Sequence, residues 1–212
     1  MCLLQAFLSG DFFRWVCNNW LEIFGVITGL LYIGLEINQK SAMWLVGFIT
    51  SFIYVFVFYR SKLYGDTALY VYYVAASVYG WYCWRHVPKN NNDVPDELPV
   101  SRVRLPLMAL LSAISVVLYI GIGYLLSRFT DSPVPYYDAL GTALSIVATW
   151  MLARKILEHW LFWIFINFFT SGLCLYRGLY PTAGLFLVYA LMSVAGWFKW
   201  KKSFNDISWQ SL

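Results

Sequence analysis

The stretch from residue 105 to residue 127 constrains the fold most strongly, because its 23 residues include no charged side chain. A helix needs about 20 apolar residues to cross the hydrocarbon core of a bilayer. Several other apolar runs approach that length. Of the 212 residues, 60% are hydrophobic and 12% are charged, whereas soluble domains contain about 25% charged residues. The sequence therefore predicts an all-α integral membrane protein.

An internal repeat is the second feature. The sequence SVYGWYCWR at 77–85 returns as SVAGWFKWK at 193–201, an offset of 116 residues. The longer stretches 63–85 and 179–201 share nine identities in 23 positions. About two are expected by chance when the commonest residues each fill about a tenth of positions. We infer that the chain contains two copies of one unit.

The apolar runs predict seven transmembrane helices, at about 20–37, 43–59, 65–84, 105–127, 138–153, 159–176 and 182–199. The expected layout is an interfacial segment (1–19), a three-helix repeat (20–85), a polar linker (86–104), an inverter helix with its loop (105–136), a second three-helix repeat (137–201) and a tail (202–212). The single helix between the two units makes them parallel repeats in a 3+1+3 plan, an arrangement found in transporters.

Lysine and arginine are distributed unequally between the two predicted membrane faces. Five fall on the face that holds the N-terminus, and ten fall on the other face. Cytoplasmic loops carry the excess of positive charge. We therefore expect the N-terminus outside and the linker, the tail and the C-terminus in the cytoplasm.

Polar side chains deep in the membrane are costly, so they mark candidate binding positions. Asn167 lies near the middle of the helix at 159–176, and its repeat mate Ser51 follows Thr50 in the helix at 43–59. An asparagine amide both donates and accepts hydrogen bonds, which suits a carboxamide or sugar hydroxyls. The alternative role for Asn167 is a hydrogen bond between packed helices.

Tryptophans accompany these polar residues. Trp160, Trp163 and Asn167 are three and four residues apart, which places them on one helix face, and Trp44 is the repeat mate of Trp160. Indole rings hold a flat cationic ring well. We expect a small-molecule site here, with lipid-facing or core tryptophans as the alternative. Asn38 and Gln39 close the first helix, and Gln39 either reaches a ligand from that end or serves as a loop residue.

The sequence gives little support for metal binding, catalysis or nucleic-acid binding. His86 and His159 are the only histidines, and Cys2, Cys17, Cys83 and Cys174 show no zinc-binding spacing. We find no enzyme motif and predict no catalytic residue, metal or cofactor. Basic loops explain the net charge of +4 better than nucleic-acid binding does. Arg154, Lys155 and Glu158 are expected to form a charged turn.

Two stretches resemble the PnuC-type bacterial vitamin transporters, which carry nicotinamide riboside. They are LYGDTALYVYYVAASVYGWYCW at 63–84 and DALGTALSIVATWMLARKILEHWLFWIFIN at 138–167, and the resemblance spans roughly residues 20–200. It implies a topology similar to the SWEET sugar transporters, a homotrimer, and one substrate site in each protomer. The family's WxxWxxxN stretch falls on Trp160, Trp163 and Asn167, and its polar end of the first helix falls on Asn38 and Gln39. Tyr70 stands where we expected a glutamine.

The resemblance also implies a location in the bacterial inner membrane and trapping of the riboside by a cytosolic riboside kinase. No acidic residue is expected near the middle of any helix, which favours facilitated diffusion over coupling to protons or sodium. Two alternatives remain open. In the first, the cargo is another vitamin (thiamine or riboflavin) or a sugar. In the second, the protein is a membrane scaffold or sensor that transports nothing.

Overall fold

The computed structural model describes residues 19–61, 64–86, 98–130 and 134–210. These residues form seven helices and no β-strand: α3 (Trp20–Ile37), α4 (Ala42–Arg60), α5 (Tyr64–Arg85), α6 (Leu105–Phe129), α7 (Pro135–Ala153), α8 (His159–Tyr176) and α9 (Tyr180–Gln210). The predicted all-α fold is confirmed, and the helix bounds agree to within a few residues except at the end of α9. The predicted segment 1–19, apart from Asn19, and residues 87–97 of the linker lie outside the described residues.

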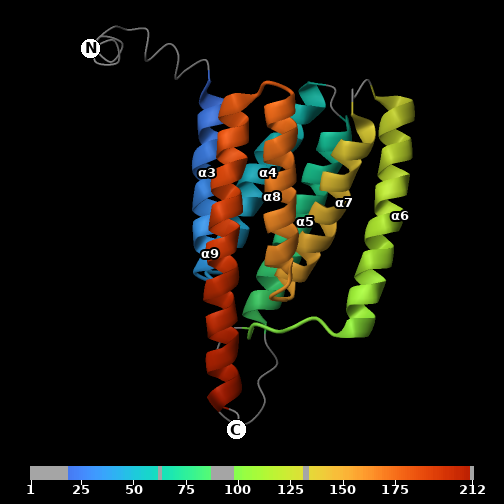
Figure 1. Cartoon of the computed structure of the whole chain (residues 1–212). Helices are drawn as coiled ribbons and strands as arrows, with labels where there is room; N and C mark the ends of the chain where they lie inside the picture. Colours follow the sequence, from blue (N-terminus) through green and yellow to red (C-terminus); the bar gives the residue numbers. More distant parts are fainter. Residues whose placement is uncertain (1–18, 62–63, 87–97, 131–133, 211–212) are drawn as a thin grey trace, which may run out of the picture.

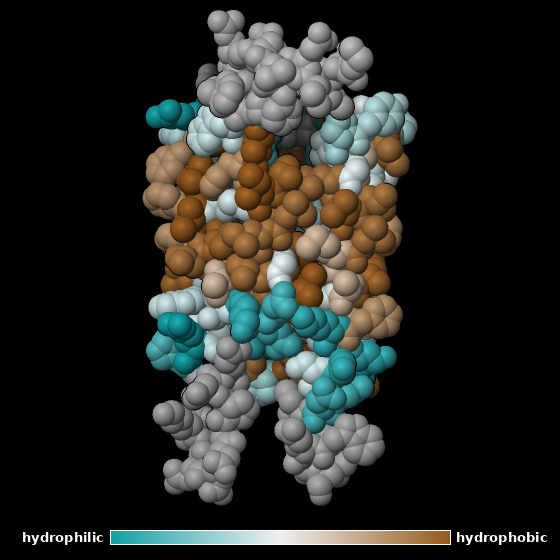
Figure 2. All heavy atoms as spheres, turned by 90° about the vertical axis from the view of Figure 1, so that its left-hand side faces the viewer, coloured by the Kyte–Doolittle hydropathy of each residue, from teal (hydrophilic) through white to brown (hydrophobic). Residues whose placement is uncertain are grey.

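Five of these helices are long and apolar enough to cross a membrane: α3, α4, α6, α8 and α9. The other two, α5 and α7, have 22 and 19 residues but contain more tyrosine, serine and threonine. Figure 2 shows an apolar band between two polar ends on the face formed by α3 and α9. Large apolar side chains such as Val117 on α6 are exposed, which is expected of a surface that faces lipid.

Six helices form a closed ring, and the seventh lies outside it. Helix α3 packs against α4, α4 against α5, α5 against α7, α7 against α8, α8 against α9, and α9 against α3. Helix α6 packs mainly against α7, at one side of the molecule (Figure 1). The ring therefore consists of the triplet α3–α5 and the triplet α7–α9, with two seams between them, α3 to α9 and α5 to α7.

The turns that open the second helix of each triplet have the same backbone geometry. Gln39 and Lys155, which are 116 positions apart, are the only non-glycine residues with positive φ in the described part of the chain, at 56° and 49°. The bond from Lys40 N to Leu35 O (2.9 Å) has its counterpart from Ile156 N to Met151 O (3.0 Å). A left-handed residue at the same place in both turns stops the preceding helix and redirects the chain.

Four buried tryptophans close the end of the ring that holds Ile37 and Arg154, which we call the lower end; the upper end holds Trp20 and Arg60. Trp44, Trp84, Trp160 and Trp200 are at most 2% exposed, and we call them the tryptophan plug. Trp44 and Trp84 pack edge to face with ring centroids 5.7 Å apart, and Trp160 and Trp200 do the same at 5.7 Å.

Two glycines make room for the plug. A side chain at Gly80 would collide with the ring of Trp44, and a side chain at Gly196 would collide with the ring of Trp160. These two glycines are again 116 positions apart. The glycine of the Gly-Trp-x-x-Trp pattern that both copies share therefore lets the helix backbone approach an indole of the neighbouring helix closely.

The expected charged turn at the lower end is only partly correct. Lys155 is 1% exposed and its Nζ lies 4.3 Å from the centroid of the Trp84 ring, so it is a buried cation rather than a solvated one. The Glu158 carboxylate accepts a hydrogen bond of 3.0 Å from Val103 N and lies 3.9 Å from Arg102. The sequence could not show this, because the segment before α6 returns against the turn between α7 and α8 and covers it.

Candidate functional site

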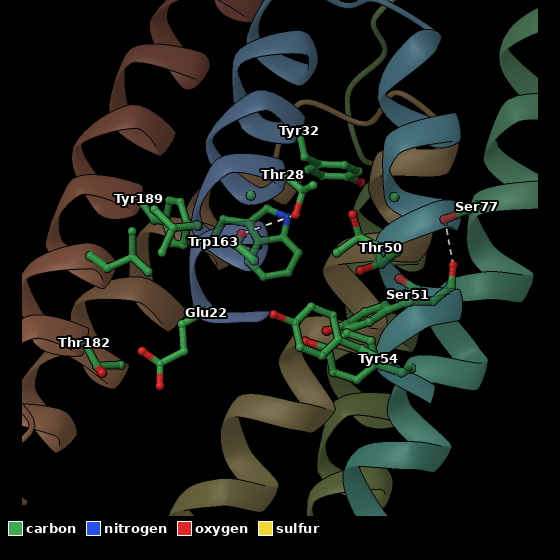
Figure 3. A pocket seen from close by; sticks show the side chains of 18 of the residues that line it. Glu22, Thr28, Tyr32, Thr50, Ser51, Tyr54, Ser77, Trp163, Thr182 and Tyr189 are labelled. Carbon is green, nitrogen blue, oxygen red and sulfur yellow. Dashed lines mark hydrogen bonds between the residues drawn. The ribbon is translucent and has the colours of Figure 1, made fainter. Parts of the chain in front are cut away.

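A cavity of about 760 Å³ lies inside the ring and is lined by all six of its helices (Figure 3). Seven aromatic side chains contribute to its wall: Tyr32, Trp44, Tyr54, Tyr70, Tyr73, Trp163 and Tyr189. Six small hydroxyl side chains lie between them: Thr28, Thr50, Ser51, Ser77, Thr149 and Thr182. Aromatic faces with a few hydrogen-bonding groups are typical of a small-molecule site.

Three polar atoms on this wall have no partner. Among the described residues, four buried side-chain nitrogen or oxygen atoms lack a hydrogen bond, and three belong to cavity-lining residues: Trp44 Nε1, Thr50 Oγ1 and Trp163 Nε1. Buried polar groups are almost always hydrogen-bonded, and leaving one unpaired costs about 1–3 kcal/mol. A ligand that offers acceptors to the two indoles would remove this cost.

The wall carries one charge. Glu22 in the first turn of α3 is the only charged side chain among the described residues that line the cavity, and it is exposed. Figure 3 places Glu22 and Thr182 together, away from Tyr32 and Ser77. The cavity therefore has a neutral aromatic interior and an acidic group at one end.

The two ends of the cavity differ. Glu22, Pro181 and Thr182 at the upper end are exposed, whereas Trp44 at the lower end is 1% exposed and belongs to the tryptophan plug. From Glu22 to Tyr32 the wall follows ten residues of α3, or roughly 15 Å at the rise of an α-helix. The cavity is deep enough to bury a ligand, and its lower exit is closed by the plug.

Four of the eight predicted site residues line this cavity. Trp44, Thr50 and Ser51 come from α4, and Trp163 comes from α8. The site predicted from the repeat and from helical spacing therefore includes residues of both triplets that line one cavity. Residues of α4 and α8 line the same cavity because these two helices hold equivalent positions on opposite sides of the ring.

The other four lie elsewhere. Trp160 is part of the tryptophan plug, beside Trp200. Asn167 donates a hydrogen bond of 3.3 Å to Ser193 Oγ on α9. Asn38 donates to Gly34 O (2.7 Å) and accepts from Lys199 Nζ (2.6 Å). Gln39 occupies the turn after α3 and is absent from the cavity wall.

The prediction missed many lining residues, among them these on α4, α5 and α9: Tyr54, Tyr70, Tyr73, Ser77 and Tyr189. The repeat held a signal for three of them, because Tyr73 and Tyr189 are mates and Ser77 is conserved in both copies. Tyr70 lines the cavity although a glutamine was expected there. Helix α5 therefore contributes to the wall through tyrosine.

A buried pair of titratable groups lies beside the plug. His159 is fully buried, its Nδ1 lies 2.7 Å from Ile156 O, and its Nε2 lies 3.1 Å from Glu36 Oε1. A carbonyl can only accept, so Nδ1 carries a hydrogen and Nε2 shares one proton with the Glu36 carboxyl. This pair joins α3 to α8. No group of three or more metal-ligating side chains occurs in the part of the chain that the structure describes.

The sequence model of the nicotinamide mononucleotide transporter family matches residues 19–202. The chain is 26% identical over 209 residues to the nicotinamide riboside transporter PnuC of Escherichia coli (strain K12), a match that covers 89% of this chain and 87% of that protein. It is 27% identical over 194 residues to the protein of the same name from Neisseria mucosa, covering 87% of this chain and 73% of that protein.

Two further similarities bear on fold and cargo. The riboflavin/roseoflavin transporter RibM of Streptomyces davaonensis is 24% identical over 185 residues, with 85% of this chain and 84% of that protein covered. The crystal structure of the vitamin B3 transporter PnuC is similar with a TM-score of 0.71 at 24% identity, and the match covers 96% of this chain and 90% of that chain. The latter supports the helical architecture described above.

Proposed function

This chain belongs to the nicotinamide mononucleotide transporter family, and from that premise we propose that it carries nicotinamide riboside across a bacterial inner membrane by facilitated diffusion. Relatives named as nicotinamide riboside transporters share 24–27% of its residues. The observation that carries the proposal is the aromatic cavity with unpartnered indole and hydroxyl groups on Trp44, Thr50 and Trp163.

The chemistry of the cavity fits the riboside. Its pyridinium ring is flat and permanently cationic, and an indole or phenol face stabilises such a ring by up to about 2 kcal/mol once water is excluded. The ribose hydroxyls and the carboxamide oxygen supply acceptors for Trp44 Nε1 and Trp163 Nε1, and Thr50 and Ser51 bond to the remaining hydroxyls. These four residues form the proposed site, together with the tyrosines of the wall.

The riboside fits better than the mononucleotide for which the family is named. A bound phosphate requires arginine or lysine. The described residues that line the cavity include neither, and the one charge among them is the acidic Glu22. We therefore propose that the phosphorylated form is rejected, and that a cytosolic riboside kinase traps the cargo by phosphorylating it after release.

Transport proceeds by alternating access between two parallel repeats. The matched turns at Gln39 and Lys155 and the matched tryptophan pairs support a pseudo-two-fold relation between the triplets. Helix α6 lies outside the ring and restores the direction of the second triplet, as expected of an inverter. The excess of lysine and arginine on the other predicted face supports an external N-terminus. With that orientation, the exposed lining at the upper end and the intact plug at the lower end favour a state open to the outside.

Assembly as a homotrimer belongs to the same proposal and rests on the resemblance of the chain to its family. Helix α6 supports it only in part, because its exposed apolar face fits lipid as well as a neighbouring subunit. Native mass spectrometry of the protein in detergent tests it, with a single trimeric species as the expected result.

Riboflavin is the second candidate cargo, because RibM is similar along 85% of this chain. Calorimetric titration of purified protein with nicotinamide riboside, riboflavin, thiamine and the mononucleotide separates the candidates. We expect micromolar or tighter binding of the riboside alone. If riboflavin or thiamine binds and the riboside does not, the proposal of a carrier stands and its cargo is that vitamin.

The transport mode has its own test. In proteoliposomes loaded with unlabelled riboside, external labelled riboside should enter by counterflow. At zero membrane potential, an imposed proton or sodium gradient should leave the steady-state level unchanged. A protein that binds the riboside but shows no counterflow is a scaffold or a sensor rather than a carrier.

A further inference from the structure

We propose that Glu22 selects positively charged ligands at the upper end of the cavity. This inference rests on the proposed function and adds a specificity determinant to it. Glu22 lies in the first turn of α3, is exposed, and is among the residues that line the cavity. A ligand that enters from the upper end passes this carboxylate before it reaches the aromatic interior.

The first turn of α3, which carries Glu22, is bonded to the neighbouring helix α4. Tyr54 Oη on α4 donates a hydrogen bond of 3.0 Å to Leu21 O, which ties the first turn of α3 to the cavity wall. Thr28 Oγ1 donates to Phe24 O at 2.8 Å, so the next turn of the helix is also bonded locally. Among the described residues, the carboxylate of Glu22 has no hydrogen bond or ion pair.

A carboxylate in the first turn of a helix commonly serves only to complement the helix dipole. A second observation points to a ligand. Trp44, 1% exposed at the far end of the same cavity, has an indole N–H without a partner. Thr50 and Trp163 add two more unpartnered groups on the same wall. The cavity is thus built to receive a polar guest, and the only charge on its described wall is that of Glu22.

The sign of that charge decides which guests are favoured. A monocation is attracted to the mouth and a phosphate monoester is repelled, and the attraction acts on the rate of encounter as well as on affinity. Because Glu22 is exposed, water and salt screen it, so its effect on affinity is small. Exposed charge pairs correspond to about a threefold to fivefold change in Kd.

Two forms of one ligand test this directly. Nicotinamide riboside is a cation, and its reduced dihydropyridine form has nearly the same shape and no charge. For Glu22→Gln we expect Kd for the cationic riboside to rise by about threefold to fivefold and Kd for the reduced riboside to stay unchanged. The association rate of the cation, followed by stopped-flow quenching of tryptophan fluorescence, should fall and lose most of its dependence on salt.

Two further variants complete the design. Glu22→Asp keeps the charge and should keep the preference for the cation. Asp66→Asn removes a carboxylate from the first turn of α5, at the same end of the bundle but not among the described residues that line the cavity, and should change both constants less than Glu22→Gln does. Equal weakening of both forms of the riboside by Glu22→Gln, or no weakening of either, would overturn the role of Glu22.

The outcomes separate this inference from the proposed cargo. If the wild type binds the riboside and Glu22→Gln shows no difference between its two forms, the cargo stands and the inference fails. If the wild type binds thiamine instead, which is also a cation, and Glu22→Gln weakens it, the inference stands and the cargo is replaced. Binding of neutral riboflavin alone would overturn both.

Discussion

Trp200 Nε1 donates a hydrogen bond of 3.0 Å to the carbonyl oxygen of Glu36, and this bond joins α9 to α3 across one seam of the ring. Its counterpart runs from Trp84 Nε1 to Leu152 O at 3.3 Å and joins α5 to α7 across the other seam. Both donors and both acceptors are related by the offset of 116 residues. An equivalent indole bond therefore crosses each seam at the lower end, in addition to the bond from Lys199 Nζ to Asn38 on the α3–α9 seam. Any movement of one triplet against the other must break or bend both indole bonds.

Removal of either indole donor should weaken the closed lower end. In Trp200→Phe the carbonyl oxygen of Glu36 keeps the bond from Gln39 N but loses the bond from the indole, a loss of about 0.5–1.5 kcal/mol. We expect a lower Tm in detergent and faster release of bound riboside, and the same from Trp84→Phe. Trp81→Phe is the matched control, because Trp81 is 43% exposed on α5. Indistinguishable stability of Trp200→Phe and Trp81→Phe would mean that the seam bonds do not hold this end.

Glycines in contact with the plug should not tolerate a methyl group. Gly80→Ala and Gly196→Ala each place a Cβ against an indole ring, and overpacking of this kind costs about 1–3 kcal/mol. Gly184→Ala, also within α9, meets nothing within 4 Å and should be neutral or stabilising by up to about 1 kcal/mol. Thermal unfolding of the three variants checks this, and equal Tm values would contradict it.

The Glu36–His159 pair should behave as a coupled unit. Glu36→Leu leaves His159 Nε2 unpaired, and His159→Leu leaves a buried carboxyl unpaired, so each change alone should destabilise the protein by several kcal/mol, about 3–5 where a charge is left. The double variant removes both groups and should be less destabilised than the sum of the single ones, by about 0.5–3 kcal/mol. Additive effects in this double-mutant cycle would show that the two groups do not interact.

Unpartnered atoms on the cavity wall should matter for binding and not for folding. Trp163→Phe and Thr50→Val each delete one such atom, and loss of a hydrogen bond of about 0.5–1.5 kcal/mol raises the Kd for the riboside by about twofold to tenfold. Trp160→Phe deletes an unpartnered indole N–H that lies in the plug, and its Kd should stay within about twofold. Calorimetric titration distinguishes the two groups of variants. A larger rise in Kd for Trp160→Phe than for Trp163→Phe would mean that Trp160 contacts the ligand.

Three residues of α8 that share one helix face have different surroundings. Trp160, Trp163 and Asn167 share one helix face, and the sequence suggested one site for all three. In the ring that face meets three environments in turn: the plug at Trp160, the cavity at Trp163 and α9 at Asn167. Spacing predicts which side chains share a face, but only packing decides what each of them contacts.

The burial of polar residues near helix ends was also not predictable from the sequence. Glu36 lies one residue before the end of α3, yet its side chain is 3% exposed because α8 and α9 pack over it. Hydropathy located the helices well, because every apolar run of sufficient length became one. Hydropathy does not show how the turn at Gln39 packs against α8 and α9.

The neutral interior of the cavity has an electrical consequence. A riboside held against Trp44 and Trp163 has no carboxylate beside it among the described lining residues, because Glu22 remains at the upper end. In the proposed transport, the cation crosses without a counter-charge, and each turnover moves one elementary charge. A potential of 100 mV, negative inside, contributes about 2.3 kcal/mol to that movement, which corresponds to roughly fiftyfold accumulation. A carrier that couples to no ion can therefore still draw on the voltage of the cell.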